Sequence, residues 1–527
     1  MTTGQLISRE TAVTVLLLVV LGVVMMLTNR WITFMDDEIA ILQDATAPIQ
    51  ETVQAFVDGN GLHRHPPLYD LVLAVWLRLT GGAVALLRLP ATVFYVLGLW
   101  FVIQSAGLIG GTGAARAALS IGLIFPYGFH FGRVAGWYSF SFFSLALVTW
   151  AYLHLEEKPG WGRWSVLIFA AVLGIYANYF LLAVLGLLAL DYLLAHRQEF
   201  AKHLMAASAT LIVILLAFSP LLWAFFFRLA ADRSILRPVF SITATTVFGG
   251  YNLYTLFVSE SVAPWFWYLS LPATLAIGLC ALLLVRHGPP PARRMFFGFL
   301  ACMLVMTLLN LINTKRLLFL SPWLLIPLSV MLAGLPAVSL RKWAAIALSM
   351  IGGIGWFGIF SRHYYAAPRL IEPWPSVASA VAGDVRKGAV VIGNNPSFFF
   401  YLTDAIRSSG SDASRGFAGM YPVCMRHPQL FNPNQWLEAG GVFAPTTLLV
   451  KGAADETLWA STVAAEKVLD QACHLEGVRR ELPDSGFAWK QRWFASAGQP
   501  AWRIEVRTYG CPGADGGAVR ARLGSGG

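Results

Sequence analysis

The sequence predicts a polytopic α-helical membrane protein of about 11 transmembrane helices, followed by a small C-terminal α/β domain. Of the 527 residues, 57% are hydrophobic and only 13% are charged, whereas soluble domains carry about twice that charged fraction. Apolar stretches long enough to cross a bilayer, about 20 residues each, recur up to residue 360. Beyond residue 360 the chain is polar and rich in Pro, Gly and Asp, which favours a water-exposed domain.

The charge balance and the cysteines narrow the class of protein. Lys and Arg outnumber Asp and Glu by 38 to 28, and basic cytoplasmic loops or anionic lipid and phosphate partners explain this excess without nucleic acid. The five cysteines lack the spacing of a zinc site. Cys280 and Cys302 lie in apolar runs, and one disulfide could form among Cys424, Cys473 and Cys511 if the tail is extracytoplasmic.

The first span covers residues 12–29 and lacks a small-residue cleavage site, so we expect it to remain uncleaved. Residues 30–88 then form the first extracytoplasmic loop. Apolar residues recur at helical spacing from Glu38 onward, and we expect this helix to kink at Pro48. A second helix opens at Pro66-Pro67 and ends at Gly81-Gly82. Both helices are predicted to lie in the membrane interface.

The remaining spans are predicted from hydropathy, and their orientation is predicted from loop charge. With a cytoplasmic N-terminus, the basic loops at 196–203, 286–294 and 341–342 fall inside, as the positive-inside rule requires. The same count puts residues 36–38 and the tail outside. The ten further spans are 89–109, 115–131, 137–154, 162–178, 179–196, 204–227, 264–286, 294–312, 317–335 and 342–360.

The domain boundary follows from the change in composition. Residues 1–360 are predicted to form the transmembrane domain and residues 361–527 an extracytoplasmic α/β domain. Within the tail, GAVVIGNNPSFFFYL indicates a buried strand, a turn and then a helix or strand, while TTLLVKG indicates a second strand. STVAAEKVLDQA has the composition of a helix, and the residues beyond about Cys511 are Gly-rich.

Three consecutive carboxylates, Asp36-Asp37-Glu38, stand just beyond the first span. A charge at the edge of the bilayer is expensive and usually functional. A carboxylate can take a proton as a general base, and arginines on the same side can bind phosphate. Asp36 or Asp37 could also cap the following helix. The candidates for binding phosphate are Arg88, Arg133 and Arg316, with Lys315 in support.

The order of these motifs resembles the C-type glycosyltransferase superfamily, in the branch of protein O-mannosyltransferases and bacterial lipid A aminoarabinose transferases (glycosyltransferase family 39). The resemblance spans roughly residues 10–335. It rests on a DE pair after span one, then HPPLY at 65–69 and LRLP at 87–90, and more weakly on RVAGWYS at 133–139 and KRLL at 315–318.

The resemblance implies an inverting enzyme that moves a sugar from a polyprenyl-phosphate carrier to a hydroxyl of a lipid, glycan or protein, on the outer side of the cytoplasmic membrane. By motif position Asp37 matches the catalytic aspartate and Glu38 its neighbour. The candidates for substrate contact are Asp36, His65, Tyr69 and Tyr138.

Several alternatives stay open at this point. Glu38 could simply favour the helix dipole, Arg88 could only reach toward headgroups, and Arg133 with Tyr138 could be an interfacial anchor. No metal ligands are assigned, although the three carboxylates could bind a divalent cation. The chain could also be a transporter or flippase of envelope glycans, but no inverted repeat or broken pair of spans supports this. A third alternative is a non-catalytic membrane anchor that displays the tail.

Overall fold

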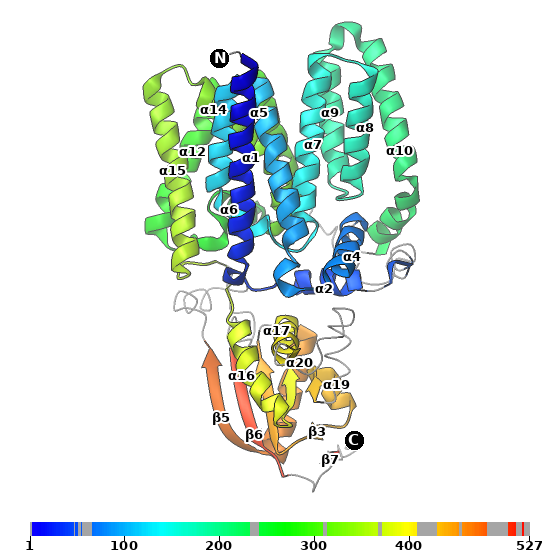
Figure 1. The fold of residues 1–527 in the computed structure, drawn as a ribbon, viewed down its shortest axis with the longest axis vertical. Coiled ribbons are helices and arrows are strands. Elements are labelled where there is room, and N and C mark those ends of the chain that lie inside the picture. The colour runs from blue at the N-terminus through cyan, green and yellow to red at the C-terminus, as the bar shows by residue number, and fades with distance from the viewer. Residues whose placement is uncertain are drawn as a thin grey trace. The chain divides into compact units, whose positions relative to one another are not determined.

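The computed structural model describes residues 3–46, 48–50, 54, 66–231, 242–308, 314–366, 371–407, 429–452, 456–481, 504–512 and 519–520. The chain divides into two compact units (Figure 1). Unit 1 comprises residues 1–29 and 48–366, and unit 2 comprises residues 30–47 and 367–527. The sequence-based boundary at 360 therefore lies near the division at 366. The grouping of residues 30–47 with the tail was not anticipated.

Unit 1 is a helical bundle built mainly of long helices (Figure 1). Nearly all its helices are strongly apolar, as expected where lipid and neighbouring helices are the surroundings. They are α1 (Thr3–Leu27), α4 (Leu68–Thr80), α5 (Leu89–Ile124), α6 (Pro126–Phe131), α7 (Trp137–Glu157), α8 (Trp161–Ile175), α9 (Leu181–Ala195), α10 (Phe200–Ala231), α11 (Ile242–Val258), α12 (Trp267–His287), α13 (Pro290–Leu308), α14 (Pro322–Gly334) and α15 (Val338–Ser361), with 3-10 turns η2 (Val84–Leu86), η4 (Ser259–Ser261) and η5 (Thr314–Leu320).

Each of the eleven predicted spans coincides with a helical segment. Among the described residues, seven helices are long and apolar enough to cross a membrane, and an eighth is added if the bent pair η5–α14 counts as one span. The predicted spans 162–178 and 179–196 correspond to α8 and α9, which are apolar but shorter. The polytopic helical membrane fold is confirmed.

The apparent length of α5 hides two helices. Gly111 adopts φ 71° and ψ −167°, which breaks the helix between the predicted spans 89–109 and 115–131. A Cβ built on Gly122 would lie 3.0 Å from the Leu99 side chain, whereas these positions would be about 35 Å apart along a straight helix. The two arms are therefore antiparallel. The second arm ends at Ile124, and α6 follows after Phe125.

The two helices predicted in residues 30–88 are present, with one changed boundary. The first, α2 (Asp36–Thr46), stops before Pro48 and is not carried through it with a kink. The helix stops there because proline lacks a backbone donor and clashes with the preceding turn. Residues 49–50 and 54 are helical again. The second, α4, ends where Gly81 takes a left-handed φ of 63°, a conformation that glycine adopts without strain.

Unit 2 contains a three-layer α/β fold, which confirms the predicted domain class. Its five-stranded sheet has the order β2-β1-β4-β6-β5. Strand β1 pairs in parallel with β2 and β4, whereas β6 pairs antiparallel with both β4 and β5. A small second sheet pairs β3 with β7. The strands are β1 (Val390–Gly393), β2 (Leu430–Phe431), β3 (Val442–Phe443), β4 (Thr446–Lys451), β5 (His474–Glu481), β6 (Ile504–Gly510) and β7 (Val519–Arg520).

Helices cover both faces of the five-stranded sheet. In β1, Val391 packs against α16 and α17, whereas the next residue, Ile392, packs against α19 and α20. Successive strand residues point to opposite faces, so both faces of β1 are buried, as expected of a central parallel strand. The helices are α16 (Trp374–Arg386), α17 (Pro396–Arg407), α19 (Pro433–Glu438) and α20 (Glu456–Ala472).

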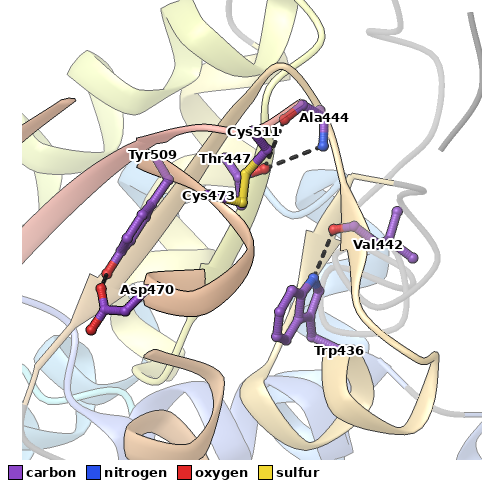
Figure 2. Close-up of a disulfide and its surroundings, with 8 residues drawn as sticks. All are labelled: Trp436, Val442, Ala444, Thr447, Asp470, Cys473, Tyr509 and Cys511. Carbon is purple, nitrogen blue, oxygen red and sulfur yellow. Dashed lines mark hydrogen bonds between the residues drawn. A yellow bond between two sulfur atoms is a disulfide. The ribbon is translucent and has the colours of Figure 1, made fainter. Parts of the chain in front are cut away.

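A disulfide joins Cys473, just after α20, to Cys511, just after β6. Figure 2 shows it beside two hydrogen bonds that hold neighbouring segments, from Tyr509 to Asp470 (2.9 Å) and from the indole of Trp436 to the Val442 carbonyl (2.8 Å). One pair among the three tail cysteines is therefore formed, while Cys424 lies outside the described residues. Cys280 and Cys302 are buried free thiols, as their apolar settings predicted.

Candidate functional site

The acidic stretch forms the first turn of α2. The Ile39 amide donates to the Met35 carbonyl at 3.1 Å, so Met35 occupies the capping position and Asp36 is the first helical residue. Neither Asp36 nor Asp37 is therefore the N-cap. All three carboxylates stand in the first turn, where the helix dipole favours negative charge.

The structure separates Asp37 from Glu38. Glu38 is fully buried, and its Oε2 accepts a hydrogen bond from the Met35 amide at 3.0 Å. This is one half of a capping box, the arrangement in which the third helical residue reaches back to the cap. Asp37 is exposed. Only the backbone of Asp36 is described.

The segment before α2 is bound to other parts of unit 2. The Phe34 amide donates to Tyr401 Oη at 2.9 Å, and Ser397 Oγ donates to the Phe34 carbonyl at 2.7 Å. Thr33 Oγ1 donates to the Glu372 carbonyl at 2.7 Å. The Phe34 and Phe400 rings lie 4.7 Å apart. We call these contacts of residues 33–34 the Phe34 clasp. Helix α17 thus holds the segment that leads into the acidic turn.

In unit 1 the structure brings Arg88 and Arg133 to the C-terminal end of α1. Arg88 Nη1 donates to the Asn29 carbonyl at 3.1 Å. Arg133 Nη1 donates to the Met25 carbonyl at 2.9 Å and to Thr28 Oγ1 at 2.6 Å. Cations are favourable at a helix C-terminus, where carbonyl groups lack helical partners. These contacts alone give both arginines a structural role.

Lys315 and Tyr138 also lie together. Lys315, in η5, places its Nζ 5.8 Å from the centre of the Tyr138 ring, in the first turn of α7. A cation over an aromatic ring at this distance is attracted by the ring quadrupole. Lys315 is buried, whereas Arg316 is only half-buried. Arg133 in turn lies 4.3 Å from the centre of the Phe129 ring.

A buried polar chain centred on His130 was missed by the sequence analysis. His130, in α6, shares hydrogen bonds with Ser259 Oγ at 2.6 Å and with Tyr365 Oη at 2.8 Å. Ser259 has a φ of 63°, which is strained for a residue other than glycine. An ionisable residue inside a predicted span is itself a signal of function, and His130 falls in the span predicted at 115–131.

Glu260, which follows Ser259 in the sequence, is a buried carboxylate. The Tyr251 hydroxyl donates to its Oε1 at 3.5 Å. Its backbone carbonyl accepts from the Ala366 amide at 2.8 Å. Among the residues that the structure describes, its Oε2 has no hydrogen-bond partner. Sequence analysis assigned Glu260 no role.

The other predicted contact residues are less informative. Tyr69 is fully buried and packs against Phe140 at 6.4 Å between ring centres, and His65 lies outside the described residues. Asn178 accepts a hydrogen bond from the Phe180 amide at 3.0 Å and so stabilises a turn. Within the described ranges, no three His, Cys, Asp or Glu side chains gather as a metal site would require.

Comparison with known proteins agrees with this architecture. Residues 64–223 match the family described as dolichyl-phosphate-mannose-protein mannosyltransferase. No curated protein sequence matches the chain.

Two of the solved structures that resemble the chain are of ArnT from Cupriavidus metallidurans. The one bound to undecaprenyl phosphate has a TM-score of 0.53 at 13% identity and covers 94% of this chain and 98% of its own. The apo structure has a TM-score of 0.55 at 12% identity and covers 95% and 98%.

Residues 64–223 thus resemble a glycosyltransferase family, and the chain has a multi-pass helical fold similar to that of ArnT. The resemblance that the motifs at 65–69 and 87–90 indicated is thereby confirmed.

Proposed function

We propose that the enzyme transfers a sugar from a polyprenyl-phosphate carrier to a hydroxyl of a lipid, glycan or protein acceptor. The donor class is supported by the structurally similar ArnT, which was solved with undecaprenyl phosphate. It is also supported by the family description, which names a sugar linked to dolichyl phosphate. For the acceptor we propose only the reacting group, a hydroxyl, because the proposed chemistry needs one.

The observation that carries the proposal is the burial of three cations in unit 1. Arg88, Arg133 and Lys315 are 1%, 0% and 4% exposed. In such a low-dielectric setting a cation attracts an anion more strongly than it does in water. A phosphate that leaves with two negative charges suits these cations, and guanidinium groups hold phosphate oxygens bidentately. We assign phosphate binding to these residues and to Arg316, with Tyr138 and Tyr69 in substrate contact.

The proposed reaction is a single inverting displacement. The acceptor oxygen attacks the anomeric carbon, the bond from that carbon to the phosphate oxygen breaks, and polyprenyl phosphate leaves with the electron pair. Asp37 takes the acceptor proton as general base. Phosphate is already a good leaving group and needs cations, not a general acid. Glu38, buried and bonded to Met35, holds the first turn of α2 in place.

The proposed side of the membrane is extracytoplasmic. The disulfide Cys473–Cys511 supports this orientation for unit 2, because disulfides persist in oxidising compartments and are rare in the cytosol. The basic loops at 196–203 and 286–294 support a cytoplasmic position for the opposite ends of the helices.

The donor class is tested with purified full-length protein and radiolabelled sugars linked to undecaprenyl phosphate. Wild type should release undecaprenyl phosphate from one of them. Lys315→Met keeps the length of the side chain but removes its charge, so we expect release to slow about 10²-fold or more. Lys387→Met is the matched control, since Lys387 is exposed at the C-cap of α16.

Two results would contradict the donor assignment. One is the absence of release from any polyprenyl-linked sugar by folded wild-type protein. The other is an equal, small loss of rate in Lys315→Met and Lys387→Met. Transport of intact donor across vesicle membranes, without cleavage, would instead favour a flippase.

A further inference from the structure

A cavity of about 370 Å³ lies in unit 1 between α7, α9, α13 and α14. Its volume is within the range of small-molecule sites, about 300–1,000 Å³, which are typically apolar with a few convergent polar groups. Along α7, Tyr152 at the cavity is 14 residues beyond Tyr138, which corresponds to about 21 Å at the helical rise. The cavity is therefore separate from the residues assigned to phosphate binding.

The cavity wall is apolar and its rim is open. Leu190, Leu194 and Phe297 line it and are 53%, 62% and 52% exposed. At its base Trp323 is 2% exposed and donates to Thr149 Oγ1 at 2.9 Å. In a membrane protein an open apolar cavity adjoins hydrocarbon, and its walls lose dispersion contacts if nothing fills it. A lipid chain supplies those contacts.

One end of the cavity is polar and carries excess negative charge. Arg294 Nη1 lies 2.9 Å from Asp191 Oδ1, and Arg294 Nη2 lies 3.3 Å from Glu156 Oε1. The Tyr152 hydroxyl donates to Asp191 Oδ2 at 2.6 Å. Two carboxylates thus face one guanidinium. The nearby Arg163 lies 3.6 Å from a different carboxylate, Glu157.

We propose that this cavity is a binding site for an aminophospholipid, phosphatidylethanolamine. Lipid tails are as apolar as leucine, so the chain alone gives little selectivity over the bulk bilayer. The headgroup therefore determines which lipid the cavity prefers. A primary ammonium donates hydrogen bonds to Glu156 and Asp191 and matches their net charge, while the lipid phosphate lies toward Arg294. A quaternary choline has no N–H to donate, and an anionic glycerol headgroup meets like charge.

Native mass spectrometry of the full-length protein tests this proposal. The protein is equilibrated with equimolar phosphatidylethanolamine, phosphatidylcholine and phosphatidylglycerol, and the retained lipid is identified. Wild type should retain phosphatidylethanolamine in preference to the other two. Ala301→Phe fills the cavity and should lower its retention about tenfold. Ala209→Phe changes an exposed alanine of α10 outside the cavity and should leave retention unchanged.

A second variant separates a lost site from a misfolded protein. Glu156→Gln is isosteric and leaves the pair of Arg294 with Asp191 in place, so it should fold normally and narrow the preference for phosphatidylethanolamine over phosphatidylcholine. Equal retention of the three lipids by wild type overturns the proposal. Unchanged selectivity in Glu156→Gln, or equal retention by Ala301→Phe and wild type, overturns it as well.

Discussion

At the scale of single residues, the structure distinguishes side chains that are equivalent in the sequence. Asp37 and Glu38 are adjacent carboxylates, yet one is exposed and the other is buried and bonded to the Met35 amide. The sequence predicted the cluster, because three carboxylates beyond a span are conspicuous. It could not predict which of them turns inward, because that depends on the position at which α2 begins.

Glu38 is expected to act through helix α2 and not on substrate. Glu38→Gln keeps an acceptor for the Met35 amide, since glutamine serves equally in a capping box, and should retain most of the activity and the wild-type unfolding temperature. Glu38→Ala removes that acceptor and should lower stability by about 1 kcal/mol. Unfolding temperature and kcat are measured together. A large loss of kcat in Glu38→Gln at unchanged stability would instead assign Glu38 to the chemistry.

At the scale of helices and strands, hydropathy predicted what the bilayer imposes. Span positions were recovered because a helix in hydrocarbon must be long, apolar and internally hydrogen-bonded. The fold-back at Gly111 was recovered as a gap between two spans. The Phe34 clasp was not predicted, because its partners Ser397 and Tyr401 lie more than 360 residues away in the sequence, and no local pattern encodes such a pairing.

The Phe34 clasp is expected to position the acidic turn. Tyr401→Phe removes the acceptor of the Phe34 amide and should cost about 0.5–1.5 kcal/mol of stability. Because α2 starts two residues after Phe34, this variant should also lower kcat, and by a larger factor than the control variant does. Tyr509→Phe removes a comparable hydrogen bond, to Asp470, elsewhere in unit 2 and is the control. Equal effects of both variants on kcat would show that the clasp has no positioning role.

A charge network on the sheet of unit 2 makes its stability depend on pH. Burial alone would raise the pKa of Glu505, but hydrogen bonds from Lys451, Arg507 and Arg480 lower it from 4.5 to about 2. A carboxyl whose pKa is lower in the folded state than in the unfolded state stabilises the folded state at pH values above its unfolded-state pKa. This stabilisation is lost as the pH falls from 4.5 toward 2.

The test compares the unfolding temperatures of wild type and Glu505→Gln across pH. Glu505→Gln should be less stable than wild type at pH 7, and the difference should shrink steadily below pH 4.5. A difference that stays constant down to pH 2 would mean that the ion pairs do not set the pKa of Glu505.

At the scale of the whole molecule, two compact units each hold part of the proposed machinery. Unit 1 carries the buried cations Arg88, Arg133 and Lys315, and unit 2 carries Asp37. The sequence assigned Asp37 to the transmembrane domain because it follows the first span directly. The structure instead groups residues 30–47 with the tail. The segment that carries Asp37 therefore belongs to the same compact unit as the tail, where α17 holds it through the Phe34 clasp.

The central claim, that Asp37 is the general base of a glycosyl transfer, is tested most directly by Asp37→Asn. Single-turnover release of undecaprenyl phosphate from the labelled donor is measured for wild type, Asp37→Asn and Asp384→Asn. The last is a matched change in α16, at a side chain that is 44% exposed. We predict that Asp37→Asn lowers the rate about 10²–10⁴-fold at an unchanged unfolding temperature, while Asp384→Asn matches wild type. A rate for Asp37→Asn within a few-fold of wild type would contradict the claim.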